Sequence, residues 1–254
     1  MSATASGRPV LLVTGASRGI GAATARLAGE RGYDVCVNYN SSRQAAEAVA
    51  DDVRSAGGRA VAVQADVACE DALLRLFETV DRELGPLRAL VNNAGTTGQA
   101  GRLESLAAET LQRVLALNVT ATVLASREAV RRMSRSHGGA GGAIVNVSSR
   151  AATLGGAGEW LHYAASKGAV ESFTLGLARE VAAEGVRVNA VSPGLIETEI
   201  HAAAGGGDRL SRLVVDVPQA RVGTAEEVAR AILWLLGGES SYVAGASLPV
   251  AGGR

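Results

Sequence analysis

The fold is decided by the stretch Thr14-Gly15-Ala16-Ser17-Arg18-Gly19-Ile20-Gly21 and by what flanks it. The apolar run Pro9–Val13 before it predicts a buried parallel strand, and a helical pattern follows it to about Glu30. Glycines let the backbone approach a bound group, and a helix N-terminus offers free N–H groups to a phosphate. The stretch therefore predicts a phosphate cradle between strand and helix. A simple tight turn is the plainer alternative.

Outward from this turn, short apolar runs alternate with helical patterns. Further strands are expected at 34–38, 60–64, 89–91, 143–147, 186–190 and within 242–250, and helices at 44–55, 71–84, 103–117, 119–134 and 224–236. This alternation predicts an α/β fold, a doubly wound Rossmann-type parallel sheet of about seven strands with helices on both faces. Residues 1–8 are expected to be a flexible N-terminus and residues 9–254 a single domain. Ligands should collect at the carboxyl ends of the strands.

Composition narrows the function classes. The 254 residues carry 25 basic and 25 acidic side chains, so the net charge favours neither nucleic acid nor an anionic membrane as partner. No secretory signal and no membrane-spanning apolar run is visible. Cys36 and Cys69 lack metal-ligand spacing, so we expect no metal site. Both cysteines are expected to be reduced, as in a cytoplasmic protein. The expected partner is a small-molecule substrate.

The end of the second expected strand bears on the choice of cofactor. An NAD enzyme of this architecture places an acid there for the ribose 2′-hydroxyl. The sequence instead reads Asn38-Tyr39-Asn40-Ser41-Ser42-Arg43, with Arg18 in the preceding turn. Guanidinium groups suit a 2′-phosphate, so we expect NADP(H) rather than NAD(H). Alternatively, Arg43 simply starts a solvated helix.

Two later segments are also candidates for cofactor contact. Asp66-Val67 follows the third expected strand, and Asp66 either accepts from an adenine amino group or caps the next helix. Asn92-Asn93-Ala94-Gly95 follows the fourth, where small and amide residues leave room for a ligand.

The segment Tyr163-Ala164-Ala165-Ser166-Lys167 carries the expected chemistry. Residues four apart lie on one helix face, so the phenol and the ammonium point the same way. A free tyrosine has a pKa of about 10, and a nearby positive charge brings that pKa toward the working range. Lys167 is the only lysine in the chain, which suggests a position that needs a compact ammonium. A chance pair on a solvated helix is the alternative.

Ser149 and Asn118 are further candidates. Ser149 follows the fifth expected strand and lacks the Gly-x-Ser-x-Gly surroundings of a hydrolase nucleophile. Asn118 lies between two helical patterns and is either a buried kink residue or a site group.

Together these residues resemble the short-chain dehydrogenase/reductase family over nearly the whole chain. The likeness rests on the glycine turn, Asn92–Gly95, the pair Tyr163 and Lys167, and Pro193-Gly194, with members such as 3-oxoacyl-carrier-protein reductases and glucose dehydrogenases. It implies a tetrad of Asn118, Ser149, Tyr163 and Lys167. It further implies cofactor contacts from Gly15, Ser17, Arg18, Gly19, Ile20, Gly21, Asn38, Tyr39, Asn40, Ser41, Arg43, Asp66, Val67, Asn93, Ala94, Gly95, Tyr163, Lys167, Pro193, Gly194, Ile196 and Thr198.

The resemblance also implies a mechanism. Tyr163 would exchange the proton with the substrate oxygen, Lys167 would lower the pKa of Tyr163 and hold the nicotinamide ribose, Ser149 would bind the reacting oxygen, and Asn118 would position a water. The interval from Ser149 to Tyr163 is one residue longer than in many members, which leaves Ser148 as an alternative serine. A homo-oligomer, a tetramer or a dimer, is implied as well, with helices at 119–134 and 163–184 as its contacts.

The substrate stays open. An NADP(H)-dependent carbonyl reductase or alcohol dehydrogenase is the leading interpretation, with a 3-oxoacyl thioester reductase and a glucose-type sugar dehydrogenase as alternatives within the same chemistry. An NADP(H)-sensing regulator is the non-enzyme alternative. Specificity is expected in 96–99, 150–161 and 195–213, and a small substrate lid near 196–217.

Overall fold

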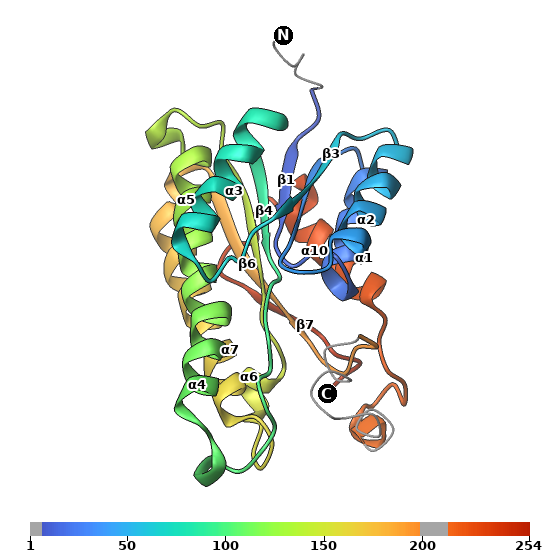
Figure 1. The fold of residues 1–254 in the computed structure, drawn as a ribbon, viewed down its shortest axis with the longest axis vertical. Helices are drawn as coiled ribbons and strands as arrows, with labels where there is room; N and C mark the ends of the chain where they lie inside the picture. The colour runs from blue at the N-terminus through green and yellow to red at the C-terminus, as the bar shows by residue number, and fades with distance from the viewer. Residues whose placement is uncertain (1–6, 199–212) are drawn as a thin grey trace.

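The computed structural model describes residues 7–198 and 213–254, and these form a parallel sheet with helices on both faces (Figure 1). The sheet has seven strands in the order β3-β2-β1-β4-β5-β6-β7, and every neighbouring pair is parallel. This confirms the predicted doubly wound architecture. The strands are β1 Val10–Val13, β2 Asp34–Tyr39, β3 Ala60–Gln64, β4 Leu87–Asn92, β5 Gly142–Val147, β6 Val186–Pro193 and β7 Ser247–Val250.

The helices form two layers. Helices α1, α2 and α10 pack on one face of the sheet and α3, α5 and α7 on the other (Figure 1). Their bounds are α1 Gly19–Glu30, α2 Arg43–Ser55, α3 Glu70–Glu83, α4 Ala108–Leu115, α5 Ala121–Met133, α6 Ala151–Leu154, α7 Leu161–Val181 and α10 Ala225–Leu236.

Burial explains the composition of the central strands. Every residue of β1 and β2 is buried, because helices cover both faces of the sheet and each side chain meets one helical layer or the other. Alternate residues of β1 divide between the layers: Leu11 and Val13 pack toward α1 and α10, while Val10 and Leu12 pack toward α3 and α5. The core is therefore continuous on both sides of the strand that leads into the glycine turn.

The strand order reverses between β1 and β4, which marks the edge where a ligand is expected. Crossovers from β1 run outward to β2 and β3, and those from β4 run the opposite way, so a crevice opens at the carboxyl ends of β1 and β4. Val13 and Val91 are paired in register at that edge. The glycine turn after β1 and the segment after β4 consequently lie next to each other.

The region from Leu103 to Met133 differs from the two separate helices that its pattern predicts. Residues Leu103–Ser105 form an isolated 3₁₀ turn, and extended backbone at Leu106 and Ala107 separates it from α4. Helix α4 then continues without a break through a π-helical turn, Ala116–Thr120, into α5. Asn118 lies inside that turn rather than in a gap between two helices. π-helical turns of this kind are frequent at functional sites.

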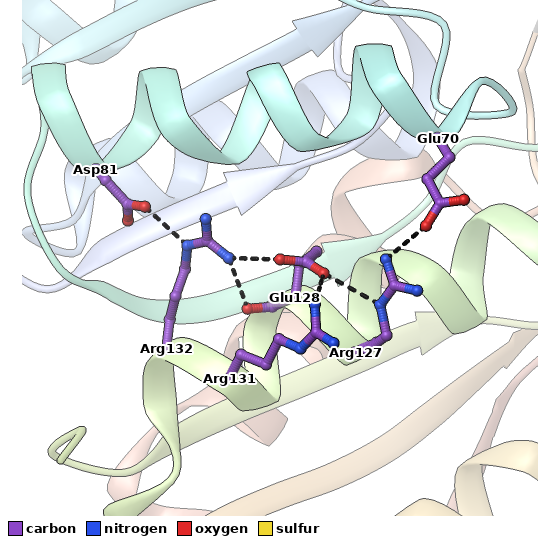
Figure 2. A network of polar contacts seen from close by, with 6 residues as sticks. All are labelled: Glu70, Asp81, Arg127, Glu128, Arg131 and Arg132. Carbon is purple, nitrogen blue, oxygen red and sulfur yellow. Dashed lines mark hydrogen bonds and ion pairs between the residues drawn. The ribbon is translucent and has the colours of Figure 1, made fainter. Parts of the chain in front are cut away.

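An ion-pair network joins α3 and α5 on the outer layer (Figure 2). The carboxylate of Glu128, only 4% exposed, accepts from Arg127, Arg131 and Arg132 at 2.9–3.1 Å. Arg127 and Arg132 reach across to Glu70 and Asp81 on α3, each at 2.8 Å. Burial raises the pKa of Glu128, but hydrogen bonds from Arg132 and Arg127 outweigh it and hold that pKa below its usual value. The network fixes α5, and with it the π-helical turn, against α3.

Some expectations fall outside what the structure describes. Residues 1–6 and 199–212 are not described, so most of the expected flexible N-terminus at 1–8 and most of the expected lid at 196–217 lie outside the described residues. Among the described helices, none has the length and apolar character needed to span a bilayer. Cys36 is buried in the core and Cys69 is exposed.

Candidate functional site

The glycine turn is built by side chains from neighbouring strands. Asn93 Nδ2 donates to the carbonyl oxygens of Thr14 and Gly15, each at 2.9 Å, and Thr14 Oγ1 accepts from the amides of Asn93 and Ala94 at 3.0 Å. Asn38 Oδ1 accepts from the amide of Gly15 at 3.2 Å. These contacts use the polar side chains to shape the turn, so the backbone itself is presented to the cavity.

Two glycines of the turn cannot be replaced without strain. Gly15 has φ +62°, and a Cβ placed on it would lie 2.9 Å from Ala94 Cα. A Cβ on Gly21 would lie 2.5 Å from Asn93 Nδ2. The turn is therefore packed directly against the segment after β4. Helix α1 begins within this stretch, at Gly19, and no side chain caps its first turn among the contacts described, which leaves its N–H groups for a ligand.

Of the residues expected to hold a 2′-phosphate at the end of β2, some line the cavity and others do not. Asn40 and Ser41 line the cavity with Arg18, as does Ser42, which the sequence argument did not single out. Tyr39 is buried in the core instead, and Arg43 is an exposed residue at the start of α2; neither is among the described residues lining the cavity. Asn38 also lines it, but its Nδ2 lies 3.1 Å from the Ala65 carbonyl oxygen, so its amide is already engaged.

Lys167 is held deep in the site. Its side chain is 5% exposed, and Nζ donates to the carbonyl oxygen of Val147 at 2.7 Å. The same Nζ lies 5.7 Å from the centroid of the Tyr163 ring. Burial lowers the pKa of Lys167 from 10.5 to about 8. The lysine can therefore exchange a proton close to neutral pH.

Ser149 and Tyr163 face the same cavity from different elements. Ser149 follows β5 and its Oγ accepts from the amide of Ala151 at 3.1 Å, while Tyr163 stands in the first turn of α7. Both line the cavity together with Lys167. Ser148, the alternative serine, also lines the cavity, but it is 2% exposed and its Oγ points toward α7, 3.0 Å from Glu171 Oε1. The geometry thus favours Ser149 as the residue that can meet a substrate.

Asn118 ties the π-helical turn to the site. Its Oδ1 accepts from the amide of Thr96 and its Nδ2 donates to the carbonyl oxygen of Thr96, both at 2.9 Å. Nδ2 also donates to Ser166 Oγ at 2.9 Å, and Ser166 Oγ donates to the Tyr163 carbonyl oxygen at 2.7 Å. A Cβ on Gly95 would lie 3.2 Å from Asn118 Oδ1 and 3.6 Å from Lys167 Nζ. Asn118 is therefore both a packing residue and a neighbour of the lysine.

The cavity that these elements surround has a volume of about 1130 Å³. Pockets for one drug-sized ligand measure roughly 300–1,000 Å³, so this one has room for a dinucleotide and a small substrate together. Its wall runs from the glycine turn to Lys167. The expected site residues that line it are Asn38, Asn40, Ser41, Asp66, Val67, Asn93, Ala94, Gly95, Ser149, Tyr163, Lys167, Pro193, Gly194, Ile196 and Thr198, with Gly15, Ser17, Arg18, Gly19 and Ile20.

Several wall residues were not expected from sequence. Arg113 on α4 and Arg254 at the far end of the chain both line the cavity, and Arg150 Nε donates to the Arg254 carbonyl oxygen at 2.8 Å. No local pattern marks either arginine, because only the tertiary fold brings them to the site. The expected specificity segments 96–99 and 150–161 do contribute to the wall, including Trp160, which is 5% exposed.

His162 and Asp66 each make a hydrogen bond to the main chain near the site. His162 is buried, and its Nε2 lies 2.9 Å from the Thr97 carbonyl oxygen, so it fastens the loop after β4 to α7. Asp66 Oδ1 accepts from the Ala68 amide at 3.0 Å while the residue also lines the cavity. Asp66 thus shapes the chain leading into α3 without leaving the cavity wall.

Comparison with known proteins places the chain among oxidoreductases. The model of a family described as enoyl-(acyl carrier protein) reductase matches residues 15–254. An uncharacterised oxidoreductase of Escherichia coli K12, YgfF, is 50% identical over 245 residues, covering 96% of this chain and 99% of that protein. Glucose 1-dehydrogenase 2 of Bacillus subtilis is 36% identical over 242 residues, covering 95% of this chain and 93% of its own length.

A solved structure agrees in both sequence and fold. A short-chain dehydrogenase from Burkholderia cenocepacia, crystallised in complex with NADP, superposes with a TM-score of 0.87. It is 36% identical, and the match covers 96% of this chain and 97% of that one. With a parallel sheet in this order, a glycine turn at its switch point and these relatives, the chain belongs to the short-chain dehydrogenase/reductase family of oxidoreductases.

Proposed function

We propose that this protein transfers a hydride between NADP(H) and a carbonyl or secondary alcohol carbon of a small substrate, with Tyr163 as the proton donor or acceptor. One observation carries the proposal. Tyr163, Ser149 and the buried Lys167 share one cavity with a glycine turn that can hold a dinucleotide phosphate. Bound NADP(H) would supply the hydride, which the protein side chains cannot.

The residues present fit such a cofactor. A turn in which a Cβ on Gly15 would strike Ala94, followed by the uncapped start of α1, suits a pyrophosphate. Asp66 and Val67, which line the cavity, would contact the adenine side, and Asn93, Ala94 and Gly95 the middle of the dinucleotide. Pro193, Gly194, Ile196 and Thr198 line the same cavity, and a Cβ on Gly19 would lie 3.5 Å from Thr198 Cγ2; this segment, 193–198, would hold the nicotinamide amide.

The preference for NADP(H) rests on charge at the end of β2. Asn38 to Ser42 contain no acid that would repel a 2′-phosphate, and Arg18 lines the cavity beside them. Arg43 is exposed at the start of α2 and supplies a second positive charge nearby. The NADP complex of the Burkholderia relative points the same way.

Each site residue then has a defined task. Tyr163 exchanges a proton with the substrate oxygen, and Ser149 Oγ donates a hydrogen bond to that oxygen. Lys167, held on the Val147 carbonyl oxygen, favours the phenolate of Tyr163 and would donate to the nicotinamide ribose hydroxyls of a bound cofactor. Asn118 lies next to Lys167 across Gly95, and because its side-chain amide is engaged with Thr96 and Ser166, a water that links the lysine to solvent would have to bind its main-chain carbonyl oxygen.

Activity with both cofactors tests this proposal. The oxidation of NADPH and NADH is followed against ketones, 3-oxoacyl thioesters and sugar lactones, and the reverse reaction against alcohols and aldoses. Turnover with NADPH is expected. Tight NADPH binding without turnover of any substrate would contradict the proposal and favour a regulator that senses the cofactor.

A matched pair of variants tests the 2′-phosphate argument. Arg18→Ala removes a guanidinium from the cavity wall, whereas Arg31→Ala removes one from the other end of α1, outside the described cavity wall. We expect Arg18→Ala to weaken NADPH binding about 10-fold with little effect on NADH, as for loss of one charged hydrogen bond. A wild-type preference for NADH would contradict the assignment.

Assembly is a separate proposal. The outer side of α7 exposes Leu161 and Leu175, at 37% and 41%, which supports an oligomer built through this helix and α5. Light scattering on the purified protein distinguishes the dimer and the tetramer from a monomer.

A further inference from the structure

Glu171 on α7 accepts hydrogen bonds from hydroxyl groups of three neighbouring strands. Its Oε1 accepts from Ser148 Oγ at 3.0 Å, from Ser192 Oγ at 2.5 Å and from Ser247 Oγ at 2.9 Å. The three serines come from the segment after β5, from β6 and from β7, which are neighbours in the sheet. One carboxylate oxygen therefore fastens three adjacent strands to one helix.

The placement of these serines connects the cluster to the site. Ser148 directly precedes Ser149 and directly follows Val147, whose carbonyl oxygen holds Lys167 Nζ at 2.7 Å. Ser192 directly precedes Pro193, which lines the cavity and begins the segment 193–198 proposed to hold the nicotinamide amide. Both Ser148 and Ser192 are 2% exposed, so their hydroxyls have little access to water.

Glu171 also lies on the face of α7 that carries Tyr163 and Lys167. It lies four residues after Lys167, as Lys167 lies four after Tyr163, so the three side chains follow one face of the helix. The backbone reinforces the link, because the Ser148 amide donates to the Val191 carbonyl oxygen at 2.8 Å and the Arg150 amide to the Pro193 carbonyl oxygen at 2.9 Å. A shift of either strand end would therefore move both.

We infer that Glu171 is a positioning residue for the reaction: through Ser148 and Ser192 it sets where Ser149, the Val147 carbonyl oxygen and the nicotinamide segment stand relative to Tyr163 and Lys167. The inference rests on the proposed function for its link to turnover. Its physical basis is hydrogen-bond geometry rather than charge, since burial is the cause that lowers the pKa of Lys167. An ångström of misplacement at such a site can cost about 100-fold in rate.

Three variants test the inference. Glu171→Ala removes the acceptor, Glu171→Gln keeps a carbonyl oxygen in its place, and Glu180→Ala removes an exposed acid from the same helix as the matched control. We expect Glu171→Ala to lower kcat on the order of 10- to 100-fold. Glu171→Gln should recover most of that loss, with an unchanged pH profile, and Glu180→Ala should match the wild type.

A double-mutant cycle identifies the path. If Glu171 acts through Ser148, then Glu171→Ala combined with Ser148→Ala should be no slower than the slower single variant, because both remove the same contact. Independent, multiplying losses would overturn the inference, as would a Glu171→Ala variant within about twofold of Glu180→Ala, at the scatter expected of unrelated sites.

A readout without turnover separates this inference from the proposed function. Because the chain has one lysine, isotope-labelled lysine gives one side-chain signal in the nuclear magnetic resonance spectrum. In the protein alone, Glu171→Ala should move that signal and Glu180→Ala should not, since the Val147 carbonyl oxygen that binds Nζ is displaced only in the first. An unmoved signal with native thermal stability overturns the inference, whereas a wild type without turnover contradicts only the proposed function.

Discussion

The two ends of the cavity use their polar side chains in opposite ways. At the glycine-turn end, Asn38, Asn93 and Thr14 spend their hydrogen bonds on the backbone of the turn, and the backbone is what meets the ligand. At the tyrosine end, Tyr163, Lys167 and Ser149 are themselves the proposed reagents, and Asn118 and Glu171 contact the elements that carry them. Binding a dinucleotide needs a surface of fixed shape, whereas moving a proton needs side chains at set distances.

The sharpest way to separate the two ends is Tyr163→Phe. The change removes one hydroxyl and leaves the glycine turn untouched, so kcat should fall about 10²- to 10⁴-fold, the usual worth of a general acid or base. The dissociation constant for NADPH, measured by the fluorescence of its nicotinamide, should stay near that of the wild type. Substantial residual turnover would mean that another group transfers the proton.

A second test uses the pH dependence of stability. The pKa of Lys167 is 10.5 when unfolded but about 8 in the folded protein because the lysine is buried. Between these values the unfolded chain binds the additional proton, so the free energy of unfolding should rise with pH by roughly 3 kcal/mol in total.

Urea unfolding of the protein without cofactor, from pH 8 to pH 10.5, measures this rise. Lys167→Met serves as the control, because it fills a similar volume without a titrating group. The two proteins should differ in slope over that window. Parallel curves would show that Lys167 keeps its ordinary pKa.

The glycine-turn end is broken by Gly15→Ala. Gly15 and Gly32 both have positive φ, at +62° and +85°, but a Cβ on Gly15 would lie 2.9 Å from Ala94 Cα, whereas nothing lies within 4 Å of one on Gly32. Gly15→Ala should therefore cost about 1–3 kcal/mol more stability than Gly32→Ala, the cost of overpacking.

The same pair of variants also reports on binding. Gly15→Ala should weaken NADPH binding, and Gly32→Ala should not, because only the first displaces the turn from the segment after β4. Equal losses from both variants, in thermal unfolding and in cofactor titration, would mean that backbone conformation alone matters at this position.

The smallest change in stability is expected from Gly168→Ala, next to Lys167. Gly168 follows Lys167 in the interior of α7, and nothing lies within 4 Å of a Cβ built on it. Gly168→Ala should raise the free energy of unfolding by about 0.4–1 kcal/mol, since alanine restricts the unfolded chain and favours the helix. Chemical denaturation measures it, and a loss of stability would reveal a contact that the single chain lacks.

The sheet and the candidate site at its edge could be predicted from the sequence, but the residues that hold the site residues in position could not. The β-strands follow from short apolar runs, and the glycine turn and the pair Tyr163 and Lys167 from local motifs and a four-residue spacing, all of which are visible in a chain without its fold. The 3₁₀ turn at Leu103–Ser105 and the continuous path through Asn118 were missed, because a π-helical turn keeps the apolar pattern of an ordinary helix.

The remaining differences are tertiary. Tyr39 was expected to contact the cofactor, but side chains alternate between the two faces of β2 and its ring is buried in the core. The neighbouring Asn38 donates its side-chain amide to the Ala65 carbonyl oxygen. Glu171 carries no motif, since its three partners lie 21 to 76 residues away along the chain. Such residues become visible only when strands from distant parts of the sequence are laid side by side.

The burial of the lone lysine has a practical consequence for proteolysis. A protease that cleaves only after lysine has one peptide bond to attack in this sequence, between Lys167 and Gly168. That bond lies in the middle of α7, beside a side chain that is 5% exposed, so cutting requires the helix to leave the sheet. The time at which two fragments appear would then measure the opening of the helix that carries Tyr163 and Lys167, and ligands could be ranked by how long each delays the cut.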